Sequence, residues 1–275
     1  MVTSLIDTHC HLDDPVFADD FQEVLHRAQQ ASVGPIVIPA VEVRSFDRTI
    51  ACAHSFEDGF YALGIHPLYV PQAQPNDLQI LEEYLRNYQD DPRLVAVGEI
   101  GLDFFVPELN QEPLKAKQLR FYHEQLKLAQ RYKLPVLLHV RRAQDLILKY
   151  ARRFPQVVGI AHAFNGSFQQ AERFLAAGFK LGVGGAMTFT RARQIRRLVT
   201  QLPMESFVLE TDAPDIPPAW LSADIGQVPR NEPFHLERIA MTLAELRAQP
   251  LAQIIQRTTE NALTVLPRLQ TASCL

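Results

Sequence analysis

Short apolar runs alternate with longer amphipathic segments along the whole chain, and this rhythm restricts its possible folds more than any other feature. The apolar runs have the length of buried strands and lie at 5–7, 36–40, 60–64, 94–99, 136–140, 158–162, 180–184 and 207–211. Helical periodicity marks the segments at 20–31, 45–55, 76–88, 114–132, 144–154, 167–177 and 191–202. Eight strands in alternation with helices are typical of a TIM barrel, whereas an open doubly wound sheet usually has fewer strands. The sequence therefore predicts an α/β fold, a (β/α)₈ TIM barrel.

Residues at several helix ends agree with this rhythm. Asn76 and Ser167 are expected to cap the helices that follow them, because such side chains accept hydrogen bonds from free backbone N–H groups. Gly34 and Gly178 stand just after two expected helices, where a left-handed residue often ends the helix.

One domain is expected over residues 1–275. The length of 275 residues exceeds the usual roughly 100–200 per domain, but α/β barrels reach about 250 as one domain. No low-complexity or Gly/Ser-rich linker divides the chain, and its 47% hydrophobic residues suffice for a sizeable core. The longest irregular stretch, 213–232, is rich in proline, and loops of that length often form lids or substrate walls.

Charge and cysteine usage exclude several classes of protein. With a net charge of −4, the chain lacks the overall basic character of proteins that bind long nucleic acids. A nucleic-acid substrate would therefore need local contacts. Three cysteines without CxxC spacing do not resemble a disulfide framework, and they favour a reducing cytoplasm. No export signal is visible, and no apolar run approaches the roughly 18 residues of a membrane span. Nothing in the sequence points to a membrane or to an obligate protein partner.

Six side chains that commonly bind metals stand at the ends of expected strands: His9, His11, Glu99, His139, His162 and Asp212. A lone His-x-His pair is often a pair of core histidines that backbone carbonyls satisfy. The complete set is different, because five strands of a barrel would bring their carboxyl ends together at the catalytic face. Buried charges are usually paired or bind metals, so this set predicts a metal-dependent hydrolase.

Six ligands exceed the needs of one tetrahedral ion, and a carboxylate can bridge two ions about 3.5–4 Å apart. Glu99 is the expected bridge, because its strand lies between the other contributors. The expected sets are His9, His11 and Asp212 for one ion, and His139 and His162 for the other. Asp212 has a second expected role as the base that takes the proton of the attacking water. Four imidazoles favour Zn, Mn, Fe, Co or Ni over Mg without singling out one of them.

Weaker candidates lie around this set. His66 ends the third strand and precedes Pro67, so it is expected to contact a phosphate or leaving oxygen, or simply to hold the loop. Arg141 follows His139 by two residues, and its guanidinium suits phosphate recognition or, equally, an exposed position in water. Glu210 shares a strand face with Asp212, and we expect it to orient a histidine rather than to bind metal.

The residues around these positions form a series of motifs. In chain order they read IDTHCHLD (6–13), GIHP (64–67), VGEIGLD (97–103), LPVLLH (134–139), HAFNGS (162–167) and ETDAP (210–214), followed by PRNEP (229–233) and TTENA (258–262). From residue 6 to about 266 the chain resembles the TatD family of metal-dependent deoxyribonucleases, a branch of the amidohydrolase-like TIM barrels.

The resemblance implies a centre of two divalent ions on the same six positions and hydrolysis of phosphodiester bonds in DNA, often from a strand end. Many cyclic amidases of the wider superfamily bridge their metals with a modified lysine, whereas this chain has Glu99. Two alternatives stay open: a barrel hydrolase of a small ester, lactone or phosphorylated metabolite, and a non-catalytic nucleic-acid-binding protein. Ala163, Asn165 and the 213–232 loop depart from the commonest family pattern, so substrate choice is the least determined property.

Overall fold

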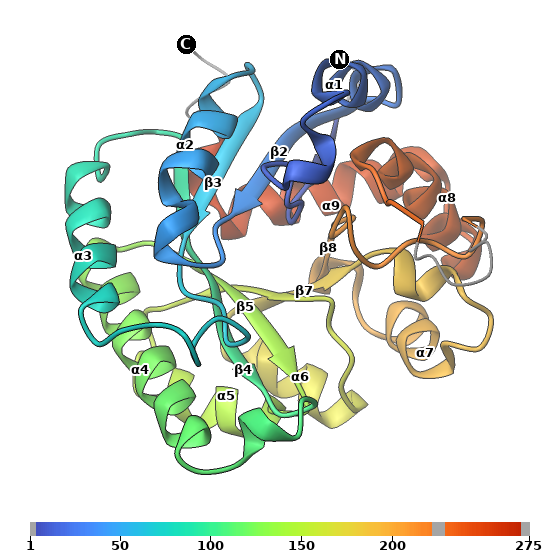
Figure 1. The fold of residues 1–275 in the computed structure, drawn as a ribbon. Coiled ribbons are helices and arrows are strands. Elements are labelled where there is room, and N and C mark those ends of the chain that lie inside the picture. The colour runs from blue at the N-terminus through green and yellow to red at the C-terminus, as the bar shows by residue number, and fades with distance from the viewer. Residues whose placement is uncertain (1–3, 222–228, 271–275) are drawn as a thin grey trace.

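The fold is a parallel sheet whose eight strands follow one another in chain order and curl into a nearly closed barrel (Figure 1). The computed structural model describes residues 4–221 and 229–270. The strands are β1 Leu5–Asp7, β2 Val33–Pro39, β3 Gly59–Leu63, β4 Leu94–Asp103, β5 Val136–Arg141, β6 Gly159–His162, β7 Phe179–Val183 and β8 Phe207–Leu209. Each neighbouring pair from β1–β2 to β7–β8 is parallel. The expected (β/α)₈ barrel is confirmed.

The barrel closes through the segments that follow β1 and β8. Three backbone hydrogen bonds join them, from the N–H of Thr8 to the carbonyl of Leu209 (3.1 Å), from Asp212 to His9 (2.8 Å), and from His11 to Ala213 (2.7 Å). The same bonds therefore close the barrel and set the backbone of three candidate ligands.

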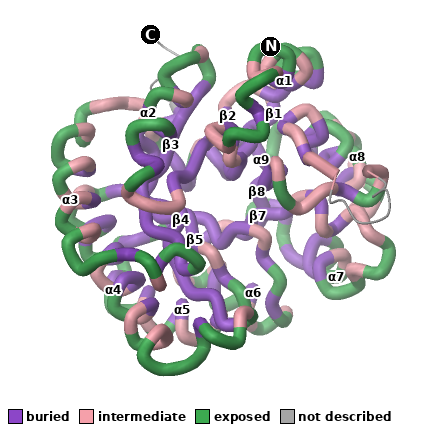
Figure 2. Tube along the Cα trace, in the orientation of Figure 1, coloured by how far each residue is buried: buried purple, intermediate pink, exposed green. Residues whose placement is uncertain are grey.

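Helices surround the sheet, with their exposed faces outward (Figure 2). They are α1 Phe21–Gln30, α2 Phe46–His54, α3 Asp77–Asn87, α4 Leu114–Tyr132, α5 Gln144–Ala151, α6 Phe168–Ala176, α7 Arg193–Gln201, α8 Leu236–Arg247 and α9 Leu251–Val265. Ser167 caps α6 in a capping box with Gln170, and Gly178 follows α6 with φ 86°, both as expected. Asn76 makes no side-chain cap, and Ser32 (φ 56°) takes the left-handed position after α1 that Gly34 was expected to fill.

Helix α9 closes the barrel at the N-terminal ends of the strands. Asn261 on α9 donates from Nδ2 to the carbonyls of Met204 and Phe207, beside the start of β8, and Thr259 donates to Ser4 before β1. Apolar side chains of α9 join those inside the barrel in one buried cluster: Ile6, Val37, Phe60, Ala62, Val95, Ala96, Leu137, Ile160, Val208, Ala262, Val265, Leu266 and Leu269. A larger cluster fills the space between sheet and helices. The open end of the barrel is thus the carboxyl end of the strands.

One expectation about strand ends is wrong in detail. β1 ends at Asp7 as expected, and His9 and His11 lie just beyond it. Glu99 lies inside β4, which continues to Asp103 after a register irregularity between Val97 and Ile100. Residues 222–228 of the expected 213–232 loop lie outside the described residues. Within the described ranges, no helix is both long and apolar enough to cross a membrane.

Candidate metal centre

The six candidate ligands converge at the open end of the barrel around Glu99. One of its oxygens, Oε2, lies 3.2 Å from His9 Nε2 and 3.7 Å from His11 Nε2. Asp212 Oδ1 lies 3.5 Å from the same atom of His9 and 3.6 Å from that of His11. His9, His11, Asp212 and one Glu99 oxygen therefore form one compact donor group.

The second oxygen of Glu99 faces a different group. Its Oε1 lies 3.0 Å from His139 Nδ1 and 3.8 Å from His162 Nε2. His66 Nε2 is 3.4 Å from this oxygen and 3.0 Å from His139 Nδ1, so His66 belongs to the buried cluster itself. The two oxygens of one carboxylate thus point into two neighbouring sets of imidazoles.

Burial and mutual charge shift the pKa values of this cluster strongly. Burial alone would raise the pKa of Glu99, but the imidazoles of His66, His9 and His162 hold it well below its usual range. Burial would likewise lower the pKa of His162, yet Asp212, Glu210 and Glu99 outweigh burial and raise it to about 10. The centre therefore combines an ionised carboxylate with a histidine that holds a proton.

The pKa values of three further members shift in the opposite sense, downward for two histidines and upward for a carboxylate. Burial lowers the pKa of His66 to about 4, so its imidazole is neutral near pH 7. Burial also lowers the pKa of His9, with the neighbouring charge of His162 adding to the effect. The pKa of Asp212 rises to about 6, chiefly through burial, which leaves the carboxylate ionised but more basic than an exposed one.

The donor set fits divalent transition ions. His9, His11 and Glu99 have donor atoms close enough to share one ion, as have His66, Glu99 and His139. Three buried atoms of the cluster, His9 Nδ1, His162 Nδ1 and Glu210 Oε2, have no hydrogen-bond partner in the described part of the chain. Imidazole nitrogens together with carboxylate oxygens suit Zn, Mn, Fe, Co or Ni better than Mg²⁺, which prefers oxygen ligands.

Asp103 orients His139 and was not singled out from the sequence. Its Oδ2 lies 3.0 Å from His139 Nε2, which turns the other ring nitrogen toward Glu99. The N–H groups of Phe105 and Val106 donate to its Oδ1. Asp103 stands four residues after Glu99, and the even spacing is a signal that could have found it.

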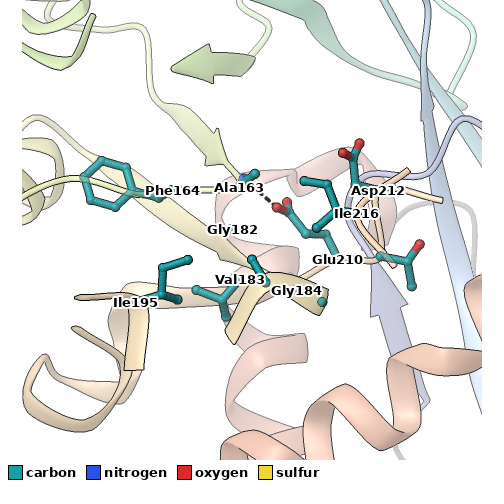
Figure 3. A pocket seen from close by; sticks show the side chains of 12 residues that line it. Ala163, Phe164, Gly182, Val183, Gly184, Ile195, Glu210, Asp212 and Ile216 are labelled. Atoms are coloured by element: carbon teal, nitrogen blue, oxygen red, sulfur yellow. Dashed lines mark hydrogen bonds between the residues drawn. The ribbon is translucent and has the colours of Figure 1, made fainter. Parts of the chain in front are cut away.

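Glu210 stands in the same relation to His162. Its buried carboxylate accepts a hydrogen bond from the Ala163 N–H through Oε1 (2.6 Å), and this oxygen lies 3.1 Å from His162 Nδ1. Figure 3 shows the carboxylate beside Gly182, with the bond to Ala163 dashed. Gly182 leaves the space it needs, because a Cβ there would lie only 2.2 Å from Glu210 Oε2.

Asp7 supports the seam between the first and last strands. It is fully buried and accepts hydrogen bonds from the hydroxyl (2.6 Å) and N–H (2.9 Å) of Thr211 and from the N–H of His9 (3.3 Å). Burial raises its pKa to about 7 despite these bonds. Asp7 precedes His9 by two residues, but its role depends on contact with β8, which no local pattern reveals.

The irregular stretch after β8 is anchored by Asn231, which sequence reasoning also missed. The buried Nδ2 of Asn231 donates to the carbonyls of Thr211 (2.8 Å) and Asp215 (3.0 Å), and its N–H donates to Pro214. These bonds fix the turn that begins at Asp212.

A cleft of about 890 Å³ opens above the centre and is bordered by loops that follow several strands. His11, Glu99, His139, His162 and Asp212 line its floor. Arg141 lies on its wall, exposed to solvent, with its guanidinium carbon 3.9 Å from the centre of the Phe105 ring. Arg141 is therefore placed above the metal cluster rather than within it.

Comparisons with known proteins agree with this arrangement. Residues 6–267 match the protein family described as TatD related DNase. The chain is 42% identical over 267 residues to the "Uncharacterized metal-dependent hydrolase YjjV" of Escherichia coli (strain K12), covering 96% of this chain and 98% of that protein. The crystal structure of that TatD homolog superposes with a TM-score of 0.88 and 40% identity, covering 97% of this chain and 99% of the other.

Two other relatives carry more specific names. The "Deoxyribonuclease TATDN3" of Homo sapiens is 32% identical over 274 residues, which cover 97% of this chain and 96% of the relative. The "3'-5' ssDNA/RNA exonuclease TatD" of Pectobacterium carotovorum (strain PC1) is 30% identical over 267 residues, covering 94% and 97%.

Proposed function

The chain belongs to the TatD related DNase family and is a metal-dependent hydrolase, and from this premise we propose that it cleaves phosphodiester bonds of DNA as an exonuclease. The two oxygens of Glu99, each facing its own set of imidazoles beneath an open cleft, are the observation that carries the proposal. The names of two relatives, a deoxyribonuclease and a 3'-5' exonuclease, support DNA as substrate and attack from a strand end.

Two divalent ions would be held by the six residues that meet at Glu99. His9, His11 and Asp212 would hold one ion, His139 and His162 the other, and Glu99 would bridge them. The contacts of Glu99 Oε2 with His9 and His11, and of Oε1 with His139, support this division. His162 Nε2 lies between the two sets, 3.8 Å from Glu99 Oε1 and 3.9 Å from Asp212 Oδ1. When bound, the ions would supply charge stabilisation at phosphorus and a more acidic water.

The protein residues would hold and move the reacting groups. Asp212, with a pKa near 6, is ionised at neutral pH and basic enough to take the proton of the attacking water. Arg141 would hold a phosphate from the cleft wall through its guanidinium. His66 would hold the loop that follows β3, because its Nδ1 accepts a hydrogen bond from the Leu68 N–H (3.1 Å) and its Nε2 lies 3.0 Å from His139 Nδ1. Glu210 and Asp103 would keep His162 and His139 in their orientations.

The proposal extends to the organisation of the chain. We take residues 1–275 as one catalytic domain, because the barrel, its surrounding helices and the closing helix α9 together form the two largest buried clusters. We place the enzyme in the cytoplasm, since the described cysteines, Cys10 and Cys52, are free thiols.

Replacement of Asp212 tests the function and the mechanism together. Asp212→Asn should retain the fold and at least one ion while lowering turnover on single-stranded DNA by orders of magnitude. Asp145→Asn on α5, an exposed carboxylate that does not line the cleft, is the matched control and should keep normal turnover. Metal content, measured by elemental analysis, is compared with nucleotide release from DNA, RNA and small esters or lactones, before and after chelation.

Full activity of Asp212→Asn at normal metal content would overturn its role as the base. Turnover of small esters or lactones without nucleotide release would identify a barrel hydrolase of small molecules instead.

A further inference from the structure

Exposed apolar side chains gather at the mouth of the cleft. Of the six large hydrophobic residues that are most exposed in the described ranges, three line it: Leu68 (40%), Tyr69 (38%) and Phe105 (44%). Exposed apolar side chains that lie together often mark a binding surface, whereas scattered ones need no explanation. The metal centre does not use these side chains, so they require another explanation.

Phe105 is the most exposed of the three and is accompanied by two arginines. The guanidinium carbon of Arg141 lies 3.9 Å from the ring centre, and that of Arg142 lies 4.7 Å from it. Both arginines line the cleft, where an aromatic ring with neighbouring guanidinium groups combines a stacking surface with positive charge.

The position of Phe105 is fixed relative to the metal centre. Its N–H donates to Asp103 Oδ1 (2.8 Å), and the other oxygen of Asp103 contacts His139 Nε2 at 3.0 Å. The buried carboxylate of Asp103 therefore orients a candidate metal ligand and also holds the loop that carries the Phe105 ring.

The two sides of the cleft differ in charge. Asp13, Asp14 and Asp215 line the side formed by the segments after β1 and β8, where Arg48 is 3.4 Å from Asp13. Arg141 and Arg142 line the side after β5, without an ion pair to any carboxylate among the described residues. A polyanion is attracted to the second side and repelled from the first.

We propose that Phe105 stacks against the base of the nucleotide next to the scissile phosphate, while Arg142 binds the following phosphate. This subsite rests on the proposed nuclease function and specifies its substrate as a single strand, because stacking on Phe105 requires an unpaired base. The strand then leaves the centre over the loops that follow β4 and β5.

Kinetics on two substrates test the subsite. Phe105→Ala should lower kcat/KM for a single-stranded oligothymidylate, mainly through KM, by about five- to a hundred-fold. The loss for the same oligothymidylate with abasic residues at both ends, which keeps the phosphates but removes the bases next to the scissile bond, should be much smaller. Phe105→Trp should restore most of the loss because it keeps a stacking face, and Met241→Ala, an exposed apolar residue on α8, serves as the unaffected control.

Salt dependence tests the arginine. For single strands, each lost phosphate contact should reduce the slope of log affinity against log salt by about 0.7. Arg142→Gln should show this reduction in anisotropy titrations with fluorescein-labelled oligothymidylate, whereas Arg142→Lys should retain most of the slope.

The titrations also separate the subsite from the nuclease function. They are done with metal-loaded protein in the Asp212→Asn background, so binding is measured without cleavage. Weaker binding by Phe105→Ala supports the subsite even if the wild type releases no nucleotide, a result that would overturn only the nuclease proposal. Unchanged binding, or equal losses on both kinetic substrates, overturns the subsite even where the wild type degrades DNA.

Discussion

A methyl group added at Gly182 should weaken metal binding, because it would displace Glu210, which contacts the candidate ligand His162. In Gly182→Ala the new Cβ would lie 2.2 Å from Glu210 Oε2 and 2.6 Å from its Cδ. Non-bonded atoms normally stay about 3.5 Å apart, so the carboxylate must retreat by about 1 Å. The buried Oε1 would then lose its 2.6 Å bond from Ala163 and its position 3.1 Å from His162 Nδ1.

The expected magnitudes follow from these contacts. Overpacking of a buried site costs about 1–3 kcal/mol of unfolding free energy. Loss of the partner that orients a metal-binding histidine typically lowers metal affinity by about 10- to 100-fold. Gly182→Ala should therefore fold, with a lowered urea midpoint, and should bind metal about 10- to 100-fold more weakly in competition with a fluorescent chelator.

Gly34→Ala is the matched control, because its Cβ would crowd Ser4 Oγ at 2.8 Å near the start of β2, away from the cleft. It should lose stability while keeping the metal affinity of the wild type. Equal metal affinity in the two variants would refute the reasoning that Glu210 supports the centre through His162.

The remaining predictions concern the other supports of the centre. Asp103→Asn should lower metal affinity by about 10- to 100-fold in the same chelator assay, because His139 loses its charged partner, and unchanged affinity would contradict this role. Asn231→Leu should lower the unfolding free energy by about 1–3 kcal/mol in urea titrations, because the buried carbonyl of Thr211 and the partly buried carbonyl of Asp215 lose their donor; a midpoint equal to the wild type would count against it. Metal-free His162, with a pKa of about 10, holds a proton at pH 7.5 that a bound ion must displace, so metal affinity should rise with pH up to about 10. Calorimetric enthalpies should then vary with the ionisation enthalpy of the buffer, and identical values in all buffers would exclude proton release.

The barrel could be predicted because its signals are local. Each strand is a short apolar run and each helix an amphipathic one, so the alternation is visible without knowledge of contacts, and parallel closure brings the carboxyl ends of the strands together. For that reason residues as distant as His9 and Asp212 could be assigned to one site. Their closeness, 3.5 Å between His9 Nε2 and Asp212 Oδ1, agrees with this topology.

Details of backbone geometry could not be predicted, because they depend on the partner strand. Glu99 appears at a strand end in the sequence but lies inside β4, where the register to β5 shifts. Ser32 rather than Gly34 takes the left-handed position after α1, because Gly34 is already part of β2. Asn76 begins α3 in a helical conformation (φ −70°, ψ −18°) that does not direct its side chain to the free N–H groups.

Two of the residues that sequence reasoning missed are buried carboxylates whose partners come from other strands. Asp103 on β4 contacts His139 on β5, and Asp7 on β1 contacts Thr211 after β8. No sequence motif reveals either contact, because each depends on which strand lies alongside. Glu210 could be named as a candidate support from the sequence because it stands two residues before Asp212.

These carboxylates also explain why the centre and the barrel seam form one unit. Burying a carboxylate is costly unless hydrogen bonds compensate, and Asp7 receives its bonds from Thr211 and His9 across the β1–β8 seam. The bond from the Asp212 N–H to the His9 carbonyl crosses the same seam. Separation of β1 from β8 would therefore expose Asp7 and move His9 and Asp212 apart in one step, so the interactions that close the barrel are also those that assemble the first donor group.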